Sequence, residues 1–441
     1  MKSKQIKSII VEKLFGRYDY ELSIPSDANE NVFILYGDNG TGKSTILRLM
    51  YHLLSTEVGR SHKSYIANIV FKSLTITFDD NIIVRVHRND DNEDLIGNYW
   101  LSYKNEDVYV ECEMPCEWDE ETHQYRVNFF SPSNPSNRKS YHQIIKELQI
   151  FNVFYISDKR NNNSREDADP RLRRFRPVED PVEKEMALLH DWIISQALEA
   201  SKKGEEGTSD IYVKILSKLC SRKQKDAQVY TYEGTKNEII DLIARVHSYS
   251  QLGFISESGF KEVYEKLNSV LKTNQSNAAI ILRPYIDIQK NRIDALDNLF
   301  DTIIYLTKSL NDYLYKKRVI YSVARGFKFY QQRTETKLQQ SALIESKDEI
   351  DVKRLSSGER QLLILFSMVI RNSNACPIII IDEPEISLNI KWQRRLLSTL
   401  SYFVRDTRTQ FMLATHSFEI LASHLNNTVR VGDSYIPEEN D

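Results

Sequence analysis

Glycine is scarce in this sequence of 441 residues: there are 14, about 3% where roughly 7% is usual. Three of the 14 nevertheless fall between residues 37 and 42, which indicates positions that only glycine can occupy. Cysteine is also scarce, and four residues are too few for a disulfide framework in a chain of this length. We therefore expect a protein of a reducing compartment, the cytoplasm.

Neither sign of charge dominates, because 59 Lys and Arg residues face 62 Asp and Glu residues for a net charge of −3. This balance excludes nucleic-acid binding by charge spread over the whole surface but leaves a local basic patch open. The longest apolar stretch, near residues 362–370, is shorter than the ~18 residues that a membrane helix needs. The first residues also lack the apolar core of a signal peptide, so we expect no membrane contact.

The hydrophobic pattern predicts an α/β fold. Residues 31–36, 378–381 and 411–415 are uninterrupted apolar runs, typical of strands buried on both faces. Strand signals also dominate residues 64–130, which predicts a strand-rich N-terminal lobe. Residues 131–181 contain five of the eleven prolines, so we expect mostly loop there, with one strand at 151–156.

Helical periodicity replaces the strand pattern between residues 181 and 318. Apolar residues at three- and four-residue steps, such as Ile293, Leu296 and Phe300, predict a long helix with one buried face. We expect one α/β head interrupted by a helical insertion. Its predicted parts are 1–178, the first half of the head; 179–318, the insertion; and 319–441, the second half.

The clustered glycines belong to a phosphate-binding loop of the form G-x-x-x-x-G-K-[ST], set between a buried strand and a helix. In such a loop the backbone N–H groups and the helix N-terminus bind phosphates, the lysine neutralises β/γ-phosphate charge and the serine binds Mg²⁺. The alternative is an incidental strand–helix turn. The candidate nucleotide-binding residues are Gly37, Asp38, Asn39, Gly40, Thr41, Gly42, Lys43, Ser44 and Thr45, with Ser44 also a metal ligand.

Two carboxylates end the isoleucine-rich strand at 378–381, at the edge where α/β sheets bind ligands. We expect Asp382 to hold Mg²⁺ and Glu383 to polarise an attacking water as general base. The alternative is a solvated acidic turn. Beside a phosphate loop, the catalytic interpretation is favoured.

A third motif, Ser356, Ser357, Gly358 and Glu359, precedes an apolar helix, and His416 ends the strand at 411–415. Ser356 and Glu359 have the spacing of a capping box, so this motif also fits a well-capped helix alone. His416 alone would more often be a satisfied core residue. Because both occur in order with the phosphate loop and Asp382, we expect the motif to bind nucleotide and His416 to contact the γ-phosphate.

At these residues the chain resembles the ABC-type P-loop ATPases, in the branch that contains the SMC, RecF and OLD families. The resemblance implies an ATPase head that hydrolyses ATP to ADP and phosphate with Mg²⁺, in a head-to-tail dimer or a larger oligomer. It also implies that Ser357 and Gly358 of one copy contact the γ-phosphate of the ATP held by Lys43 of the other. Residues 385–389 lie where the family has its D-loop, and Asn389 departs from the family pattern, since Asp or His is more usual at that position. Neither Gln143 nor Gln149 is a convincing Q-loop glutamine.

Basic residues crowd one polar stretch, where acidic residues dilute them. A solvated charged loop is the simplest interpretation, and contact with nucleic acid or a protein is the alternative. The basic residues are Lys159, Arg160, Arg165, Arg171, Arg173, Arg174 and Arg176.

For function, the resemblance is closest to ATPase subunits of the PARIS and Septu anti-phage systems. It implies an ATP-driven switch that senses infection and controls a toxic effector supplied in trans, such as a TOPRIM or HNH nuclease. We expect no nuclease domain in this chain, because few residues follow His416. The alternative is a RecF- or SMC-like DNA-binding ATPase of repair or recombination; DNA is possible as a ligand, but the net charge does not favour it.

Overall fold

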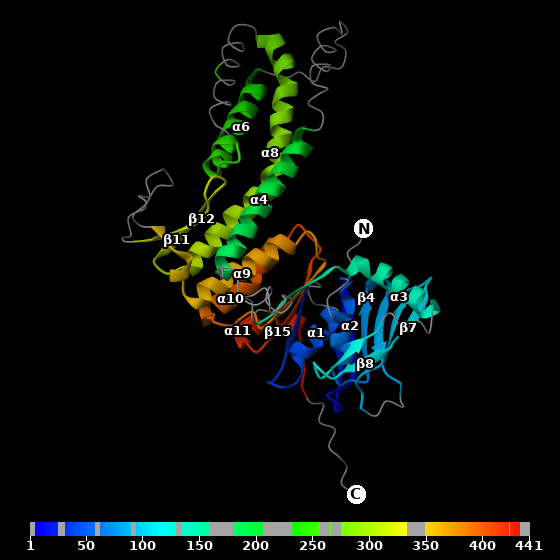
Figure 1. Cartoon of the computed structure of the whole chain (residues 1–441). Coiled ribbons are helices and arrows are strands. Elements are labelled where there is room, and N and C mark those ends of the chain that lie inside the picture. Colours follow the sequence, from blue (N-terminus) through cyan, green and yellow to red (C-terminus); the bar gives the residue numbers. More distant parts are fainter. Residues whose placement is uncertain are drawn as a thin grey trace. The chain divides into compact units, whose positions relative to one another are not determined.

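The computed structural model describes residues 5–24, 31–57, 62–89, 94–128, 135–158, 180–205, 232–255, 265, 275–332, 349–422 and 424–432. The chain divides into two compact units, the first made of Met1–Val178 with Ile364–Asp441 and the second of Glu179–Leu363 (Figure 1). The three-part division expected from the sequence stays a prediction.

A five-stranded parallel sheet forms one layer of the first unit, in the order β10-β14-β15-β3-β16. Its strands are β3 (Val32–Tyr36), β10 (Val153–Ile156), β14 (Ile378–Asp382), β15 (Gln410–Thr415) and β16 (Thr428–Arg430). Every residue of β14 and β15 is buried, which confirms the expectation that these apolar runs are strands covered on both faces.

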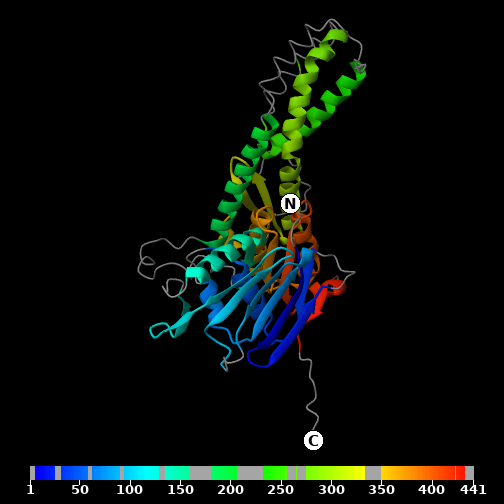
Figure 2. The same cartoon turned by 90° about the vertical axis from the view of Figure 1, so that its right-hand side faces the viewer.

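An antiparallel sheet of six strands forms a second layer, in the order β2-β1-β4-β5-β6-β7, and a hairpin, β8–β9, accompanies it (Figure 2). Its bounds are β1 (Ile6–Leu14), β2 (Tyr18–Ser23), β4 (Ser73–Phe78), β5 (Ile83–His87), β6 (Tyr99–Lys104), β7 (Tyr109–Met114), β8 (Cys116–Asp119) and β9 (Gln124–Val127). The buried amide of Gln410 ties the two sheets together, because it accepts from the Ile6 N–H at 2.8 Å and donates to the Ile6 carbonyl at 3.0 Å.

The first unit also contains helices α1 (Lys43–Leu54), α2 (His62–Ala67), α3 (Pro135–Leu148), α10 (Ile390–Phe403) and α11 (Phe418–Leu421). The expectation of mostly loop over residues 131–181 is wrong at α3, which is an amphipathic helix. Pro135 stands at its first position, where its missing N–H costs nothing, and Ile144 and Leu148 are buried one turn apart.

Helix α1, which follows the glycine-rich loop, is fixed at its far end by a buried lysine. The Lys63 ammonium donates to the carbonyls of His52, Leu53 and Ser55, at 3.0, 2.6 and 3.2 Å. These are carbonyls that the end of a helix leaves without an intrahelical partner. Burial lowers the pKa of Lys63 to about 7.

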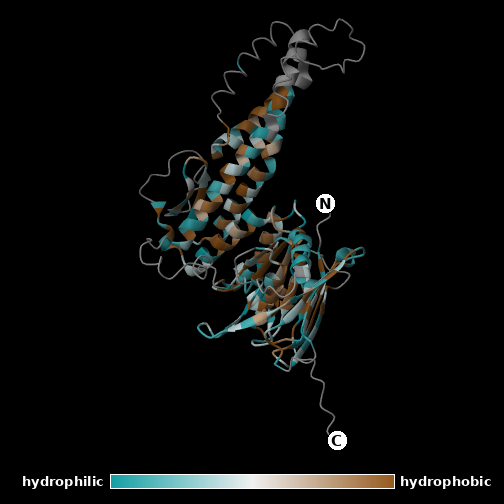
Figure 3. Ribbon diagram, turned by 45° about the vertical axis from the view of Figure 1, so that its right-hand side comes forward, coloured by the Kyte–Doolittle hydropathy of each residue, from teal (hydrophilic) through white to brown (hydrophobic). Residues whose placement is uncertain are grey.

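The second unit contains helices α4 (Pro181–Glu205), α6 (Tyr232–Leu252) and α8 (Gln275–Tyr313) and a sheet of β11 (Lys317–Ser322), β12 (Gly326–Gln331) and β13 (Glu349–Ile350). Apolar and polar residues alternate along these helices (Figure 3), and Ile293, Leu296 and Ile303 of α8 are buried as the periodicity predicted. Arg245 of α6 forms salt bridges with Asp294 and Asp297 of α8, at 2.8 and 2.7 Å. Helix α9 (Ser357–Asn372) begins in this unit. No helix of the described residues is long and apolar enough to cross a membrane.

Replacing Lys63 by Met should destabilise the first unit by about 2 kcal/mol, because it leaves buried carbonyls of the α1 end unsatisfied. The folded-state pKa of about 7 lies below the usual value of 10.5, so the unfolded chain binds more protons between these values. The contribution of Lys63 to the free energy of unfolding therefore rises with pH between about 7 and 10.5. The K63M variant should lack that rise. Denaturant unfolding at several pH values measures both effects, with the exposed Lys104→Met as control; equal stability of the two variants would contradict this capping role.

Candidate functional site

The carboxyl ends of four parallel strands bring the predicted site residues of the first unit to one sheet edge. Strand β3 ends at Tyr36 before the Gly37–Ser44 loop, β14 ends at Asp382, and β15 ends at Thr415 before His416. Strand β10 ends at Ile156 beside β14, in parallel register. This edge is where α/β sheets bind ligands.

The loop conformation requires glycine at two positions. A Cβ at Gly37 would lie 1.9 Å from the carbonyl oxygen of Val431, so no other residue fits there. Gly42 has φ of +92°, and its Cβ would meet the Leu14 side chain at 2.6 Å. The clustering of scarce glycines therefore has a steric cause at both ends of the loop.

Lys43 is buried at the start of α1, with 4% of its surface exposed. Its ammonium donates to the carbonyls of Gly37 and Asp38 at 2.9 and 2.8 Å, which fixes it inside the loop. Burial lowers the pKa of Lys43, against the opposing effect of the carboxylates of Glu383, Asp38 and Asp382. The N-terminus of α1 and this ammonium together make the loop suited to bind an anion.

Ser44 and Asp382 meet across the sheet edge. The Ser44 hydroxyl donates to Oδ1 of Asp382 at 2.8 Å, and Asp382 is 1% exposed. Burial raises the pKa of Asp382, while the hydrogen bonds from Ser44 and Tyr155 and the charge of Arg48 lower it. A hydroxyl and a carboxylate are the hard oxygen ligands that Mg²⁺ prefers, so these two residues fit a magnesium ion.

Glu383 and His416 lie at the same edge, and the backbone of His416 is held by Glu385, a residue to which the sequence had assigned no role in the site. Oε1 of Glu385 accepts from the Thr415 hydroxyl and from the His416 backbone N–H, each at 2.7 Å. Burial raises the pKa of Glu383, and the charges of Asp382 and Glu385 raise it further, whereas His416 lowers it. Glu383 also has φ of +48°, an uncommon conformation for a residue with a side chain.

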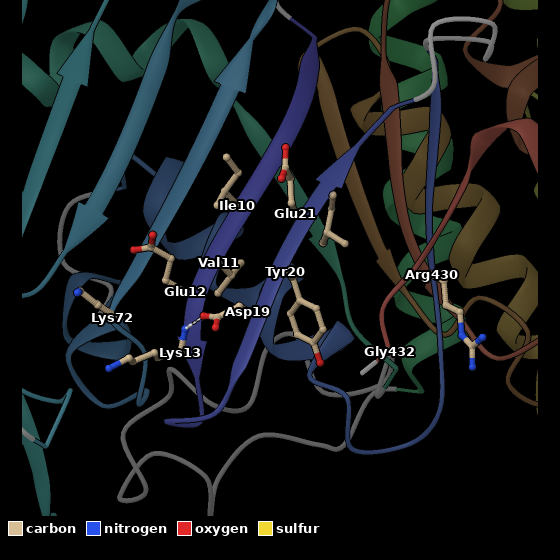
Figure 4. A pocket seen from close by; sticks show the side chains of 11 residues that line it. Ile10, Val11, Glu12, Lys13, Asp19, Tyr20, Glu21, Lys72, Arg430 and Gly432 are labelled. Atoms are coloured by element: carbon tan, nitrogen blue, oxygen red, sulfur yellow. Dashed lines mark hydrogen bonds between the residues drawn. The ribbon is translucent and has the colours of Figure 1, made fainter. Parts of the chain in front are cut away.

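Two pockets share lining residues, and the smaller of them lies beside the loop. One, of about 330 Å³, is lined by the loop residues Asp38, Asn39, Gly40 and Thr41 together with Arg17, Tyr18, Arg430 and Gly432. The other, of about 670 Å³, lies over β1 and β2 and shares Arg430 and Gly432 (Figure 4). Tyr20 lines the larger pocket and donates its hydroxyl hydrogen to the Thr41 carbonyl at 2.8 Å, so the β1–β2 hairpin supports the loop.

The turn at Ser356–Glu359 belongs to the second unit and forms the predicted capping box. The Ser356 N–H donates to Oε2 of Glu359 at 2.7 Å, and the Glu359 N–H donates to the Ser356 hydroxyl at 3.4 Å. Glu359 is 4% exposed, and the Lys317 ammonium donates to the same Oε2 at 2.7 Å. The next residue, Arg360, contacts both carboxylate oxygens of Asp180, at 2.9 and 2.8 Å.

Arg48, Tyr155 and Glu385 are the site residues that sequence reasoning missed. Arg48 could have been found from its spacing, since it lies four residues after Ser44 and therefore on the same face of α1. Tyr155 and Glu385 have no comparable signal.

Asn389 caps α10, because its side-chain oxygen accepts from the Trp392 N–H at 3.0 Å.

Neither glutamine considered for the Q-loop lies at the carboxyl end of a parallel strand. Gln143 is in α3, and Gln149 is in the 3₁₀ turn Gln149–Phe151, which precedes β10. The basic stretch from Lys159 to Arg176 lies outside the described residues. Its interpretation stays a prediction.

Solved structures similar to this chain include three SMC heads. The SMC head domain of Pyrococcus furiosus, with an extended coiled coil and bound to the C-terminal domain of ScpA, has 13% identity and a TM-score of 0.37, over 96% of this chain and 92% of that one. The Pyrococcus yayanosii SMC head with coiled coil and joint has 14% identity and a TM-score of 0.35, over 96% and 94%. An SMC head bound to the C-winged helix domain of ScpA has 12% identity and a TM-score of 0.33, over 95% of this chain and 92% of that one.

These TM-scores do not establish a shared fold, and no curated protein matches the chain significantly. The family comparison is stronger, because the model described as an AAA ATPase domain matches residues 5–421. The matched range contains the phosphate loop, the capped turn at Ser356–Glu359, Asp382 and His416. The chain therefore belongs to the AAA ATPase domain family.

Proposed function

We propose that this protein binds Mg²⁺·ATP at the sheet edge of the first unit and hydrolyses it to ADP and phosphate. The observation on which this rests is the meeting of Ser44 with Asp382 at 2.8 Å, next to the buried ammonium of Lys43. Phosphate-binding backbone, a cation and a pair of hard oxygen ligands are then within one site. That combination serves phosphoryl transfer, where catalysis consists mainly of positioning and charge stabilisation.

The residues of the loop would divide the work by position. The backbone N–H groups from Gly37 to Gly42 bind the phosphates, together with the N-terminus of α1, and the Lys43 ammonium neutralises β/γ-phosphate charge. The pocket beside Arg17 and Tyr18 adjoins the loop and is placed for the nucleoside. Ser44 and Asp382 hold the magnesium ion, which when bound neutralises phosphate charge.

Glu383 is our candidate general base. Burial and the neighbouring carboxylates raise its pKa, so it accepts a proton from water more readily than an ordinary glutamate. We assign His416 to the γ-phosphate, with its backbone held by Glu385. Glu383 also has a positive φ, a strained conformation that is typical of residues at functional sites.

We also propose that two copies associate head to tail, so that Ser356–Glu359 of one completes the site of the other. Within that turn Gly358 and Glu359 are buried, the Glu359 carboxylate against Lys317, whereas Ser356 and Ser357 are exposed. Ser357 would therefore supply the side-chain contact to nucleotide, and Glu359 shapes the turn. Exposed apolar side chains in the first unit suit association with protein. Ile390, the first residue of α10, is 59% exposed, and Phe418, two residues after His416, is 73% exposed.

The ATP-dependent association would control a protein effector supplied in trans, as in anti-phage ATPases with TOPRIM or HNH nuclease partners. Two features favour a protein over DNA as partner. The net charge is −3, and the larger described pocket has three cationic residues, Lys13, Lys72 and Arg430, against three acidic ones, Glu12, Asp19 and Glu21.

Lys43→Ala should weaken ATP binding about 100-fold, or about 3 kcal/mol, because it removes a buried cation facing the phosphates. Equilibrium binding of a fluorescent ATP analogue measures this, with the exposed Lys139→Ala as control. Unchanged nucleotide affinity in K43A would refute the site.

Glu383→Gln should keep ATP affinity and lose 10²- to 10⁴-fold in turnover, roughly the usual contribution of a general base. Since the closed dimer should then persist, size-exclusion chromatography with ATP should show a dimer that wild type forms only transiently. Normal turnover in E383Q would mean that another group activates the water.

Duplex DNA should change the ATPase rate by less than about twofold between 50 and 200 mM salt, because no counterion release couples DNA to the site. The product of the neighbouring reading frame, co-expressed with the full chain, should instead co-purify in the presence of ATP and be lost with K43A. DNA stimulation that falls steeply with salt would favour the DNA-binding alternative.

A further inference from the structure

The carboxylate of Asp382 is held from both sides by hydroxyl groups. Ser44 donates to Oδ1 at 2.8 Å, and the phenol of Tyr155, on the adjacent strand β10, donates to Oδ2 at 3.0 Å. Asp382 is 1% exposed, so water does not compete for either oxygen. The two hydrogen bonds therefore fix the rotation of the carboxylate plane.

Tyr155 is itself held in place. The Nε–H of Arg48 donates to the Tyr155 oxygen at 3.1 Å, and the ring of Tyr51 stacks on the Tyr155 ring with centroids 5.4 Å apart. The Arg48 guanidinium also lies 3.9 Å from Oδ2 of Asp382 and 3.7 Å from Oδ1 of Asp158. Since the phenol oxygen accepts from Arg48, its own hydrogen is directed at Asp382.

This arrangement leaves the two carboxylate oxygens with different tasks. Oδ2 is taken up by Tyr155 on the β10 side, while Oδ1 faces Ser44, the residue suited to share a metal with it. Groups that orient a metal ligand through its other atoms commonly decide the affinity of a site, since an unoriented carboxylate must be ordered when the metal binds.

We propose that Tyr155, fixed by Arg48, is a positioning residue that presents Oδ1 of Asp382, beside Ser44, to the magnesium ion of Mg²⁺·ATP. The inference rests on the proposed function, because it concerns the same metal site. It goes further because it assigns a part in metal binding to a tyrosine of strand β10, a strand that contains no glutamine.

Tyr155→Phe removes only the hydroxyl and tests this directly. With the non-hydrolysable analogue AMP-PNP bound, the dissociation constant for Mn²⁺, measured from the electron paramagnetic resonance signal of free Mn²⁺, should rise about 10-fold. AMP-PNP affinity in EDTA should not change, because no phosphate contact is lost. The control is Tyr99→Phe in the same unit, whose buried hydroxyl donates to the Lys63 carbonyl at 2.9 Å and has no carboxylate partner among the described residues. Its Mn²⁺ affinity should equal that of the wild type.

Tyr155→Leu separates positioning from packing. It also removes the stack on Tyr51, so its thermal midpoint should fall below that of Y155F, while its Mn²⁺ affinity should match Y155F. Unchanged Mn²⁺ affinity in Y155F would overturn the proposal and leave Tyr155 a structural residue. A wild-type protein that binds no AMP-PNP would instead refute the proposed function, and this inference with it.

Discussion

The hydrogen bond between Ser44 and Asp382 is the interaction on which the site depends, because it joins residues 338 positions apart in the chain. Ser44 belongs to the first turn of α1, and Asp382 ends β14. The strands that precede them, β3 and β14, are separated by β15 alone. Only a parallel sheet in which β3, β15 and β14 end at one edge brings the loop, the carboxylate and His416 together.

The parallel sheet is in turn fixed by what surrounds it. Its central strands are buried on both faces, so their register is set by packing and not by a solvent-exposed face. Gln410 anchors β15 to β1 through two buried hydrogen bonds, and the β1–β2 hairpin reaches the phosphate loop through Tyr20. The antiparallel layer thus supports the loop directly, while Lys63 stabilises the opposite end of α1.

Sequence reasoning predicted those parts of the fold and site in which local pattern and chemistry coincide. The buried strands β3, β14 and β15 follow from uninterrupted apolar runs, and the loop follows from glycines that the backbone geometry requires. Proline content predicts loop at residues 135–148, but the structure has helix α3 there, because proline is well tolerated in the first turn of a helix. Tyr155 and Glu385 could not be predicted, since their importance comes from neighbours distant in sequence, Asp382 and Thr415.

The residues at and after the end of β14 combine features that destabilise a turn. Burial raises the pKa values of both Asp382 and Glu383, and the charges of Asp382 and Glu385 raise that of Glu383 further. Glu383 and Ser387 also have positive φ, at +48° and +64°. Clustered carboxylates and strained backbone at one place are typical of functional sites, where stability is given up for chemistry. The cations that oppose this charge, Lys43 and Arg48, both come from α1. The same helix therefore bears the phosphate-binding lysine, the serine that meets Asp382 and the arginine that orders Tyr155, so a shift of α1 would disturb all three at once.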